Sequence, residues 1–316
     1  MTPMQLSVAI PVYNSEASLP PLIERLRTVL DSVADEYELV LVNDGSRDTS
    51  WQVIQSLAAE FPCVRGINLM RNYGQHNALL CALRAVRYPV TITMDDDLQH
   101  PPEEIPKLLE EFNKGFDLVY GTPREERHGL LRDLASVFTK LALQSAMGVD
   151  IARKVGPFRV FRTDLRKAFD KYSGSFISID VLLTWATTKV GAVPVRHEDR
   201  KFGASNYTVK KLVIHAFNMM TGFSALPLQI ASMAGFAFTL FGFVLLAYTL
   251  IRYALASNVV PGFAFLASSI AIFSGVQLFS LGIIGEYLAR MHFRMLDKPQ
   301  YTIENETDIK LESNGK

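Results

Sequence analysis

Two long segments without a charged side chain constrain the fold of this 316-residue chain more than any other feature. They cover residues 230–251 and 263–285. As helices, each would be roughly 33 Å long at about 1.5 Å per residue, enough to cross a hydrocarbon core of about 30 Å. The sequence therefore predicts a two-span transmembrane hairpin at residues 229–286, which also explains why 49% of the residues are hydrophobic.

The charges around this hairpin predict its orientation. The link between the two segments, residues 252–262, is nearly uncharged, whereas basic residues flank the outer ends of the pair. These are Lys210, Lys211, Arg290, Arg294 and Lys298. Because lysine and arginine are retained on the cytoplasmic side, both outer ends and the large N-terminal part are predicted to face the cytoplasm. The sequence thus indicates a multi-pass membrane protein.

Ahead of the spans, short runs rich in β-branched residues alternate with segments of helical spacing. The expected strands are 6–12, 38–43, 64–69, 90–94 and 116–120, and the expected helices are 19–30, 49–60, 74–86 and 103–114. Such alternation predicts an α/β fold with a mostly parallel sheet covered on both faces. The first apolar run contains Pro11 and follows no basic segment, so we expect a strand there and no signal peptide. The net charge of zero indicates no nucleic-acid partner.

Three successive carboxylates, Asp95, Asp96 and Asp97, follow the fourth expected strand. In an extended backbone, Asp95, Asp97 and Gln99 would point to one side and Asp96 to the other. Crowded oxygen ligands of this kind suit Mg²⁺ or Mn²⁺, which would keep positions open for the phosphates of a substrate. A solvated acidic loop that caps the next helix is the alternative.

Polar residues follow two other expected strands as well. The first strand ends in PVYN at 11–14, and the second in NDGS at 43–46. Each run is also typical of an ordinary turn, but the carboxyl ends of parallel strands share one edge of the sheet, where ligands bind in open α/β folds. The chain has neither a G-x-G-x-x-G nor a P-loop motif. Asp44 could instead accept hydrogen bonds from a base or ribose while a metal carries a diphosphate.

Six motifs carry a resemblance to a known family. In chain order they are IPVYN, VNDGS, RNYGQH, DDDLQHPPE, GPFR at 156–159 and DRKFGAS at 199–205. From about residue 6 to about residue 295, the chain resembles the membrane-anchored polyprenyl-phosphate glycosyltransferases of glycosyltransferase family 2. This group includes dolichyl-phosphate mannose synthases and bacterial undecaprenyl-phosphate glucosyl- and 4-deoxy-4-formamido-arabinose transferases. The run NYGQH is similar to the last of these.

The resemblance implies a GT-A domain over residues 1–206 that transfers a sugar, with inversion, from a nucleotide diphosphate sugar to a polyprenyl phosphate such as undecaprenyl phosphate. A UDP-sugar is the favoured donor. Reaction at the cytoplasmic face of the inner membrane and a homo-oligomer, by resemblance a tetramer, are also implied.

The resemblance assigns roles to individual residues. The nucleotide sugar would contact Pro11, Tyr13, Asn14, Asp44 and Asp95. The metal, Mg²⁺ or Mn²⁺, would be held by Asp95, Asp97 and Gln99, with Asp95 and Asp97 as the catalytic residues. Asp96 stands at the variable position of the family's DxD and is interpreted as a helix cap or bystander.

The acceptor phosphate is assigned to Arg124, Arg132, Ser136 and Arg200. If 130–146 is helical, Arg132 and Ser136 share one face; a solvated basic loop is the alternative. The chain departs from the family in having Asn206 where a lysine is common and Pro157 where some relatives have an acid. No general base is named, because a phosphate monoester with a second pKa near 6 is largely dianionic at pH 7.

The remaining segments flank the hairpin. Residues 207–228 mix lysines with apolar residues and predict juxtamembrane helices in the membrane interface, with a core helix as the alternative. Residues 287–316 form a predicted cytoplasmic tail that is disordered from Glu304 onward. Gly275, Gly282 and Gly285 permit close helix contacts and hence an oligomer.

Two other readings of the function stay open. One is a non-catalytic membrane subunit that binds a sugar nucleotide, and the other is a glycosyltransferase acting on a different lipid such as diacylglycerol. A transporter is disfavoured because the spans contain few polar groups.

Overall fold

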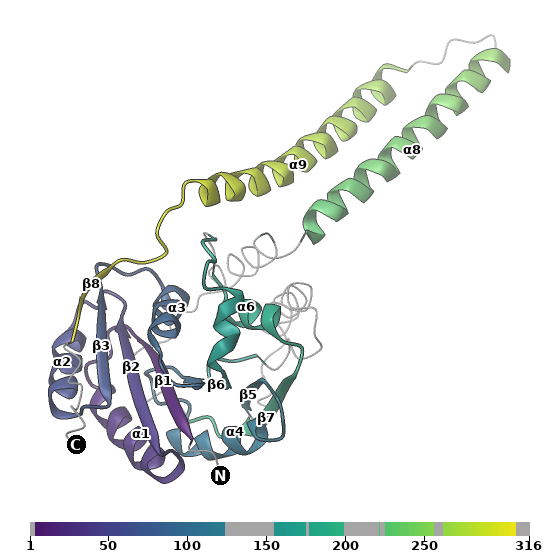
Figure 1. The fold of residues 1–316 in the computed structure, drawn as a ribbon. Helices are drawn as coiled ribbons and strands as arrows, with labels where there is room; N and C mark the ends of the chain where they lie inside the picture. The colour runs from purple at the N-terminus through teal and green to yellow at the C-terminus, as the bar shows by residue number, and fades with distance from the viewer. Residues whose placement is uncertain are drawn as a thin grey trace.

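The computed structural model describes residues 4–123, 155–174, 177–198, 221, 225–255 and 262–307. These residues form an α/β domain and two long helices that project from it (Figure 1). The four residues assigned to the acceptor phosphate lie outside the described residues, as do Asn206, the helix expected at 130–146 and most of the segment 207–228.

Within the described residues, eight strands form one mixed sheet in the order β7-β5-β6-β4-β1-β2-β3-β8. They are β1 (Gln5–Val12), β2 (Glu36–Asn43), β3 (Val64–Leu69), β4 (Val90–Thr93), β5 (Leu118–Pro123), β6 (Arg159–Arg162), β7 (Val190–Val195) and β8 (Ile303–Glu306). The four central strands β4, β1, β2 and β3 are parallel, and β6 and β8 are antiparallel to their neighbours. The expected mostly parallel sheet is confirmed, and the carboxyl ends of its central strands share one edge.

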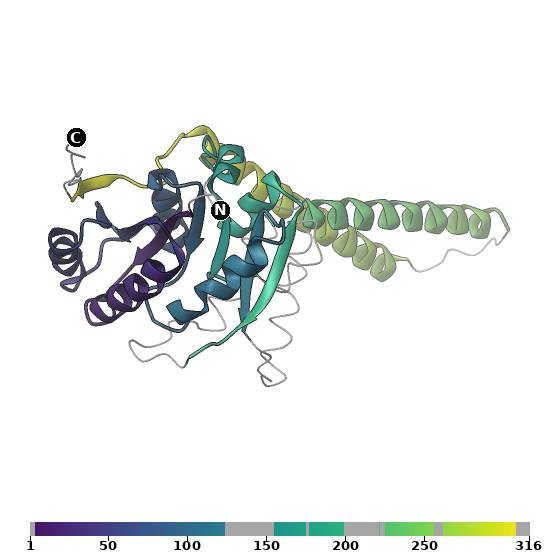
Figure 2. The ribbon, with the colours of Figure 1, turned by 60° about the horizontal axis from the view of Figure 1, so that its bottom comes forward.

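Helices cover both faces of this sheet. They are α1 (Leu19–Val33), α2 (Ser50–Glu60), α3 (Gln75–Ala85), α4 (Ile105–Phe112) and α6 (Ile179–Ala186), with 3₁₀ turns η1 (Pro102–Glu104) and η3 (Thr163–Ala168). One apolar cluster lies between the sheet and α1, α2 and α4, and a second lies between the sheet and α3 and α6. In Figure 2, α1 and α4 lie in front of the strands.

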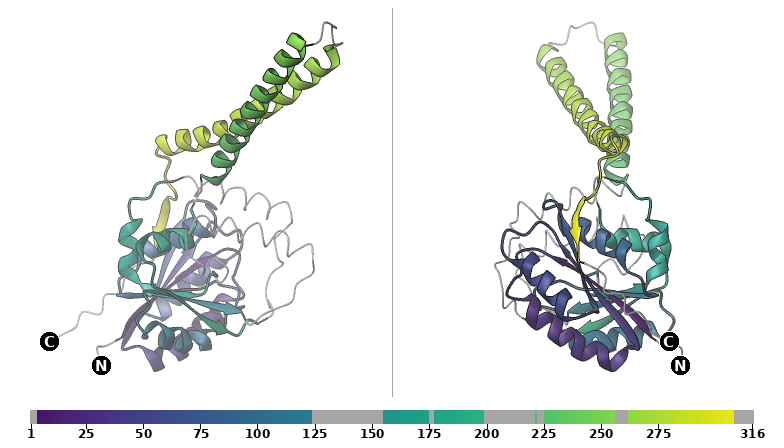
Figure 3. Two further views of the ribbon diagram at one scale, coloured as in Figure 1. Left: turned by 90° about the vertical axis from the view of Figure 1, so that its right-hand side faces the viewer. Right: turned by 60° about the vertical axis from the view of Figure 1, so that its left-hand side comes forward.

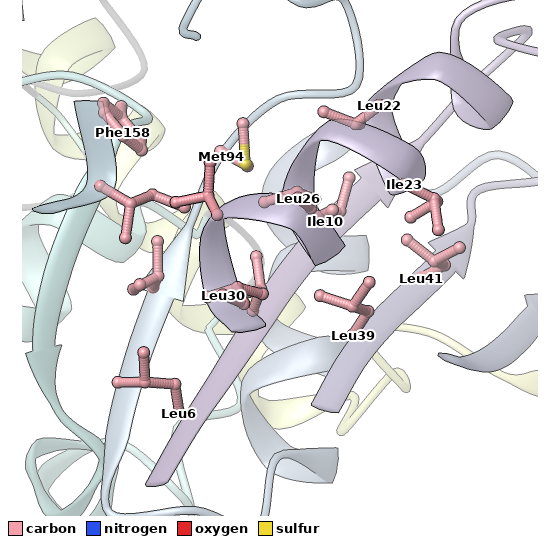
Figure 4. Packing of buried hydrophobic residues seen from close by; sticks show 14 of the residues in the cluster. Leu6, Ile10, Leu22, Ile23, Leu26, Leu30, Leu39, Leu41, Met94 and Phe158 are labelled. Carbon is pink, nitrogen blue, oxygen red and sulfur yellow. The ribbon is translucent and has the colours of Figure 1, made fainter. Parts of the chain in front are cut away.

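Alternation along the strands explains the two clusters. In β1, the side chains of Leu6, Val8 and Ile10 belong to the cluster under α1, whereas Ala9 belongs to the one under α3. Buried leucines of α1 and its one isoleucine, Ile23, point toward β1 and β2 (Figure 4). A strand with apolar residues on both faces is expected in a sheet covered on both sides, so the near-continuous apolar run of β1 follows from its central position.

The two projecting helices are α8 (Leu226–Leu255) and α9 (Phe263–Met295). Their segments Pro227–Tyr248 and Ile272–Met295 are long and apolar enough to cross a membrane. Large apolar side chains on them are exposed, for example 74% of Phe236 and 70% of Leu278. Because the core helix of a soluble protein would be buried, this exposure favours the predicted membrane hairpin.

The expectation of disorder from Glu304 onward is wrong for residues 304–307. Strand β8 follows α9 and pairs antiparallel with the edge strand β3 (Figures 1 and 3). Its side chains fit this edge, since Glu306 forms an ion pair with Arg65 at 2.9 Å and Glu304 accepts a hydrogen bond from Asn68 at 2.7 Å. The residues of β8 are polar because their side chains pair with polar side chains of β3, so this composition does not indicate disorder here.

Candidate active site

A cavity of about 200 Å³ lies at the carboxyl ends of β1, β2 and β4. Five residues that the sequence assigns to the donor or the metal line it, namely Pro11, Tyr13, Asp44, Asp95 and Asp97. These side chains come from strands far apart in the sequence, and the parallel pairing of β1 with both β2 and β4 brings them together. Their individual roles remain predictions.

Asp96 also lines this cavity, and its hydrogen bonds go to the loop after β1, so its interpretation as a helix cap is wrong. Its Oδ2 accepts hydrogen bonds from the Tyr13 amide at 3.1 Å and from the Ser15 hydroxyl. The expected alternation fails because β4 ends at Thr93 and the backbone turns at Asp96 and Asp97. Burial raises the pKa of Asp96 to about 6, although both hydrogen bonds oppose the rise. Asp96 thus joins the loops that follow β1 and β4.

Asp44 holds the loop after β3 in place at the cavity. Its Oδ1 accepts the amide of Tyr73 at 2.7 Å, and its Oδ2 accepts the amide of Gly74 at 2.8 Å. Burial raises the pKa of this carboxyl, and the two amides oppose the rise. Because each carboxylate oxygen can accept more than one hydrogen bond, Asp44 can still accept from a base at the cavity.

The loop held by Asp44 supplies cavity residues to which the sequence assigned no role. These are Asn72, Gly74 and Gln75. Gln75 donates from Nε2 to Oδ1 of Asp95 at 2.6 Å, so it contacts a predicted metal ligand directly. The signal that could have identified them is their place after β3, the strand next to β2 in the parallel sheet.

Asn14 and Gln99 do not line the cavity. Asn14 connects two loops, since its amide donates to the Ser46 hydroxyl at 3.0 Å and its Oδ1 accepts the amide of Arg47 at 2.8 Å. The side-chain nitrogen of Gln99 lies 3.3 Å from Nε2 of His197. The contact of Asn14 with a nucleotide remains a prediction, and so does the contact of Gln99 with a metal.

The two carboxylates Asp95 and Asp97 fit a hard divalent cation. No group of three or more His, Cys, Asp or Glu side chains is arranged to hold a metal within the part of the chain that the structure describes. This donor set therefore does not form an all-protein cage. Mg²⁺ is commonly bound through one or two carboxylates, with water and substrate phosphates in its other positions, and two carboxylates on one open cavity match that pattern.

Comparison with known proteins identifies the family. The sequence matches the family described as "Glycosyl transferase family 2" over residues 7–169, which is just over half of the chain. This chain belongs to glycosyl transferase family 2. The predicted α/β, GT-A-type fold class and the glycosyltransferase activity are thereby confirmed.

Similar proteins extend over nearly the whole chain. The undecaprenyl-phosphate 4-deoxy-4-formamido-L-arabinose transferase of Shewanella sediminis is 35% identical over 304 residues, covering 95% of this chain and 92% of that protein. The transferase of the same name from Pseudomonas fluorescens strain Pf0-1 is 37% identical over 307 residues, covering 95% and 89%. Because these alignments extend through α8 and α9, the resemblance to the membrane-anchored branch of the family is confirmed.

Solved structures with a similar backbone have lower identity. Staphylococcus aureus TarS in complex with UDP has a TM-score of 0.47 and 18% identity, covering 69% of this chain and 64% of that one. Glucosyl-3-phosphoglycerate synthase from Mycobacterium tuberculosis with Mn²⁺ and UDP-glucose has a TM-score of 0.48 and 16% identity, covering 69% and 77%.

A buried ion pair supports the strand that carries the carboxylates of this family 2 glycosyltransferase. Arg159 of β6 is 1% exposed and forms an ion pair with Asp180 at the start of α6. Its Nε donates to the Thr93 hydroxyl at 2.8 Å, and that hydroxyl donates to the carbonyl of Pro157 at 2.7 Å. Thr93 is the last residue of β4, so this network fixes the backbone directly before Asp95.

The segment that precedes Arg200 lies against the continuation of the same carboxylate loop. Arg196 donates from Nε to the buried carboxylate of Glu104 at 2.6 Å. The amide of Glu198 donates to the carbonyl of Gln99 at 2.8 Å. Residues 196–198 are therefore positioned by residues 99–104, which follow Asp95, Asp96 and Asp97 closely in the chain.

We expect replacement of Gly45 by alanine to disturb this site. Gly45 has φ +60°, and an added Cβ would lie 2.4 Å from the Arg71 carbonyl carbon and 2.5 Å from the Asn72 nitrogen. The turn must open, which separates Asp44 from the loop after β3. The expected cost is about 1–3 kcal/mol of folding free energy, together with weaker binding of nucleotide. Thermal unfolding of the full chain in detergent, with and without UDP, measures both.

Gly115→Ala is the matched control for this change. Gly115 also has a positive φ, of +103°, but an added Cβ would meet nothing within 4 Å among the described residues. It therefore carries the backbone strain without the close contact. If both variants lost nucleotide binding equally, the close contact between residue 45 and the Arg71–Asn72 backbone would not be the cause of the loss.

Proposed function

We propose that this protein transfers a sugar from a nucleotide diphosphate sugar, with a UDP-sugar favoured, to a polyprenyl phosphate such as undecaprenyl phosphate. The observation that carries the proposal is one cavity lined by Asp44, Asp95 and Asp97 in a family 2 chain. Relatives named as undecaprenyl-phosphate transferases cover 95% of the chain, the apolar hairpin included, and support the lipid acceptor.

In this proposal Asp44 binds the base, and Pro11 and Tyr13 border the nucleotide. Asp95 and Asp97 hold Mg²⁺ or Mn²⁺, which neutralises the negative charge that develops on the leaving diphosphate. An oxygen of the acceptor phosphate forms the new bond to the anomeric carbon. The bond from that carbon to the diphosphate breaks, and the nucleotide diphosphate leaves with the electron pair from the opposite face, so the configuration inverts.

This reaction needs no protein base. A phosphate monoester is mostly dianionic at pH 7, so its oxygen is already nucleophilic. The work of the chain is to align donor and acceptor and to exclude water from the cavity. Arg124, Arg132, Ser136 and Arg200 are proposed to bind the acceptor phosphate, with no contribution from Asn206, which lacks the charge of a lysine.

The membrane hairpin brings the acceptor to the cavity. Lipid phosphates lie at the membrane surface, and the hairpin, which projects from the α/β domain (Figure 1), would keep the domain at that surface. The basic residues at the outer ends of the spans favour a domain in the cytoplasm and a multi-pass protein of the inner membrane. A homo-oligomer remains a prediction. In the described chain, an added Cβ on Gly275, Gly282 or Gly285 would meet nothing within 4 Å, so these positions are open to another chain.

The full chain in detergent, supplied with radiolabelled UDP- or GDP-sugars and undecaprenyl phosphate, tests the proposal. We expect an organic-soluble product with Mg²⁺ or Mn²⁺ from one class of donor. EDTA is expected to reduce the rate to background, and added metal to restore it, because Asp95 and Asp97 are themselves negatively charged and would repel the diphosphate without a cation between them.

Two results would point to the other readings. Binding of a nucleotide sugar without transfer from any donor would favour a non-catalytic subunit. Transfer to diacylglycerol but not to undecaprenyl phosphate would favour another lipid acceptor. Transfer that persists in EDTA would contradict the metal role of Asp95 and Asp97.

A further inference from the structure

A second cavity, of about 340 Å³, lies where the end of α9 meets the α/β domain. None of its lining residues belongs to the candidate active site. One wall is formed by residues 170–173 and by Arg84 at the carboxyl end of α3, and the other by residues 297–301, directly after α9. The cavity therefore joins the domain to the membrane hairpin.

The charge pattern of α9 places this cavity at the level of the lipid headgroups. The helix is uncharged up to Gly285, and its last turns carry Glu286, Arg290 and Arg294. The uncharged part of α9 ends at Gly285, and the candidate membrane span as a whole, with these charges in its last turns, ends at Met295, two residues before Asp297 of the cavity. Figure 3 shows this end of α9 beside the domain. The cavity is thus close to the boundary between hydrocarbon and water.

Arg84 carries a charge that its protein contacts do not neutralise. Its guanidinium donates to the carbonyls of Asp170 at 2.8 Å and Tyr172 at 3.2 Å, and to the side-chain oxygen of Gln300 at 3.0 Å. All three acceptors are neutral. No carboxylate lies within 4.0 Å of Arg84 among the residues that the structure describes. A half-buried cation of this kind favours an anion nearby.

Further cations surround the same cavity. Lys171 and Lys298 line it. Burial raises the pKa of Tyr172, and the positive charges of Arg294 and Arg290 at the end of α9 oppose the rise. Against these five cations stand three carboxylates. Asp170 and Asp297 line the cavity, and Glu286 is paired with Arg290 at 2.8 Å. The surplus charge is positive.

We propose that this cavity binds the phosphate of an anionic phospholipid and holds the α/β domain against the membrane. In this proposal Lys171 and Lys298, which line the cavity, bind the phosphate oxygens, and the positive charge of Arg84 attracts the phosphate. The acyl chains lie along exposed apolar residues in the last turns of α9, where Leu288 is 58%, Met291 61% and Met295 82% exposed. Basic pockets beside the cytoplasmic ends of membrane helices are a known way to bind anionic headgroups. This inference is independent of the sugar-transfer proposal.

Lipid binding to the full chain tests the inference without any assay of activity. Native mass spectrometry of the detergent-purified protein, titrated with phosphatidylglycerol or phosphatidylcholine, compares the wild type with Lys171→Gln/Lys298→Gln. We expect phosphatidylglycerol to bind more tightly than phosphatidylcholine. The double variant should lose about 30-fold in affinity for phosphatidylglycerol, since each lysine near an anionic surface contributes about a factor of five.

Lys167→Gln is the matched control, because Lys167 lies in η3 near the same surface but pairs with Asp164 outside the cavity. It should bind phosphatidylglycerol as the wild type does. Inorganic phosphate and undecaprenyl phosphate are added as competitors, and neither should displace the phospholipid. Equal affinity in the double variant, an equal loss in the control, or displacement by either competitor would overturn the proposal.

Discussion

Replacing Asp97 with asparagine is expected to reduce the rate of sugar transfer by about a thousandfold or more, equivalent to roughly 4 kcal/mol of transition-state stabilisation. Asparagine has nearly the same shape but lacks the negative charge that a divalent cation needs beside the leaving diphosphate. The side chain of Asp97 lines the cavity, and its Oδ1 accepts the amide of Gln99 at 3.0 Å, a contact that an asparagine oxygen can keep. The fold should therefore be retained while kcat falls.

Three measurements separate this effect from a general loss of function. The transfer rate in detergent gives kcat, titration with Mn²⁺ gives the metal requirement, and thermal unfolding checks the fold. Asp164→Asn serves as a control, since Asp164 is an exposed carboxylate paired with Lys167 and lies away from the cavity. Transfer by Asp97→Asn at a rate close to that of the wild type would rule out Asp97 as an essential metal ligand.

Replacing Asp180 with alanine is expected to give the largest loss of stability. The change leaves Arg159 charged, 1% exposed and without its ion-pair partner. Removing one partner of a buried ion pair costs roughly 3–5 kcal/mol. For a domain of this size, such a loss should lower the unfolding temperature by about 10 °C. Because the only tryptophans, Trp51 and Trp185, lie in α2 and α6, their fluorescence reports the unfolding of the α/β domain alone.

Two further variants identify the cause of that loss. Asp164→Ala removes an ion pair in which both side chains are at least 70% exposed, and it should leave the unfolding temperature nearly unchanged because solvent screens the pair. The double replacement Arg159→Met/Asp180→Leu should recover most of the stability, because it removes the uncompensated charge along with the pair. If the double variant is as unstable as Asp180→Ala, the loss comes from packing and the argument from charge is wrong.

The two predictions together describe how the site is built. Asp180 holds Arg159, and Arg159 donates to the side-chain hydroxyl of Thr93. Asp95 and Asp97 follow Thr93 by two and four residues. Destabilising the pair should therefore also lower activity at temperatures where the domain is still folded. The Arg159–Asp180 pair matters for activity because the side chains that bind substrate must be held within a fraction of an ångström, about 0.5 Å, of the geometry that the reaction needs.

The sequence by itself determined most of the helices and strands, and it determined which edge of the sheet carries the candidate active site. Hydrophobic periodicity depends only on neighbouring residues, so the strands β1–β5, the helices between them and α8 could be predicted to within a few residues. The start of α9 could be predicted as well, but the helix continues to Met295, ten residues past the predicted end of the uncharged segment at Gly285. The shared edge followed from the rule that parallel strands end on the same side. This rule predicts that Asp44, Asp95 and Asp97 lie together, and all three line the cavity.

Only the tertiary structure decided the contacts between segments that are far apart in the chain. The insertion of β6 between β4 and β5, and the addition of β8 to β3, depend on pairing over long separations that local periodicity does not encode. The turn after Thr93 brings Asp96 into the cavity against the alternation of an extended strand. The position of Gln99 beside His197, and the ion pair of Arg159 with Asp180, likewise depend on packing between distant elements. Sequence pattern specifies which side chains each element presents, whereas the packing of the elements specifies which partners those side chains meet.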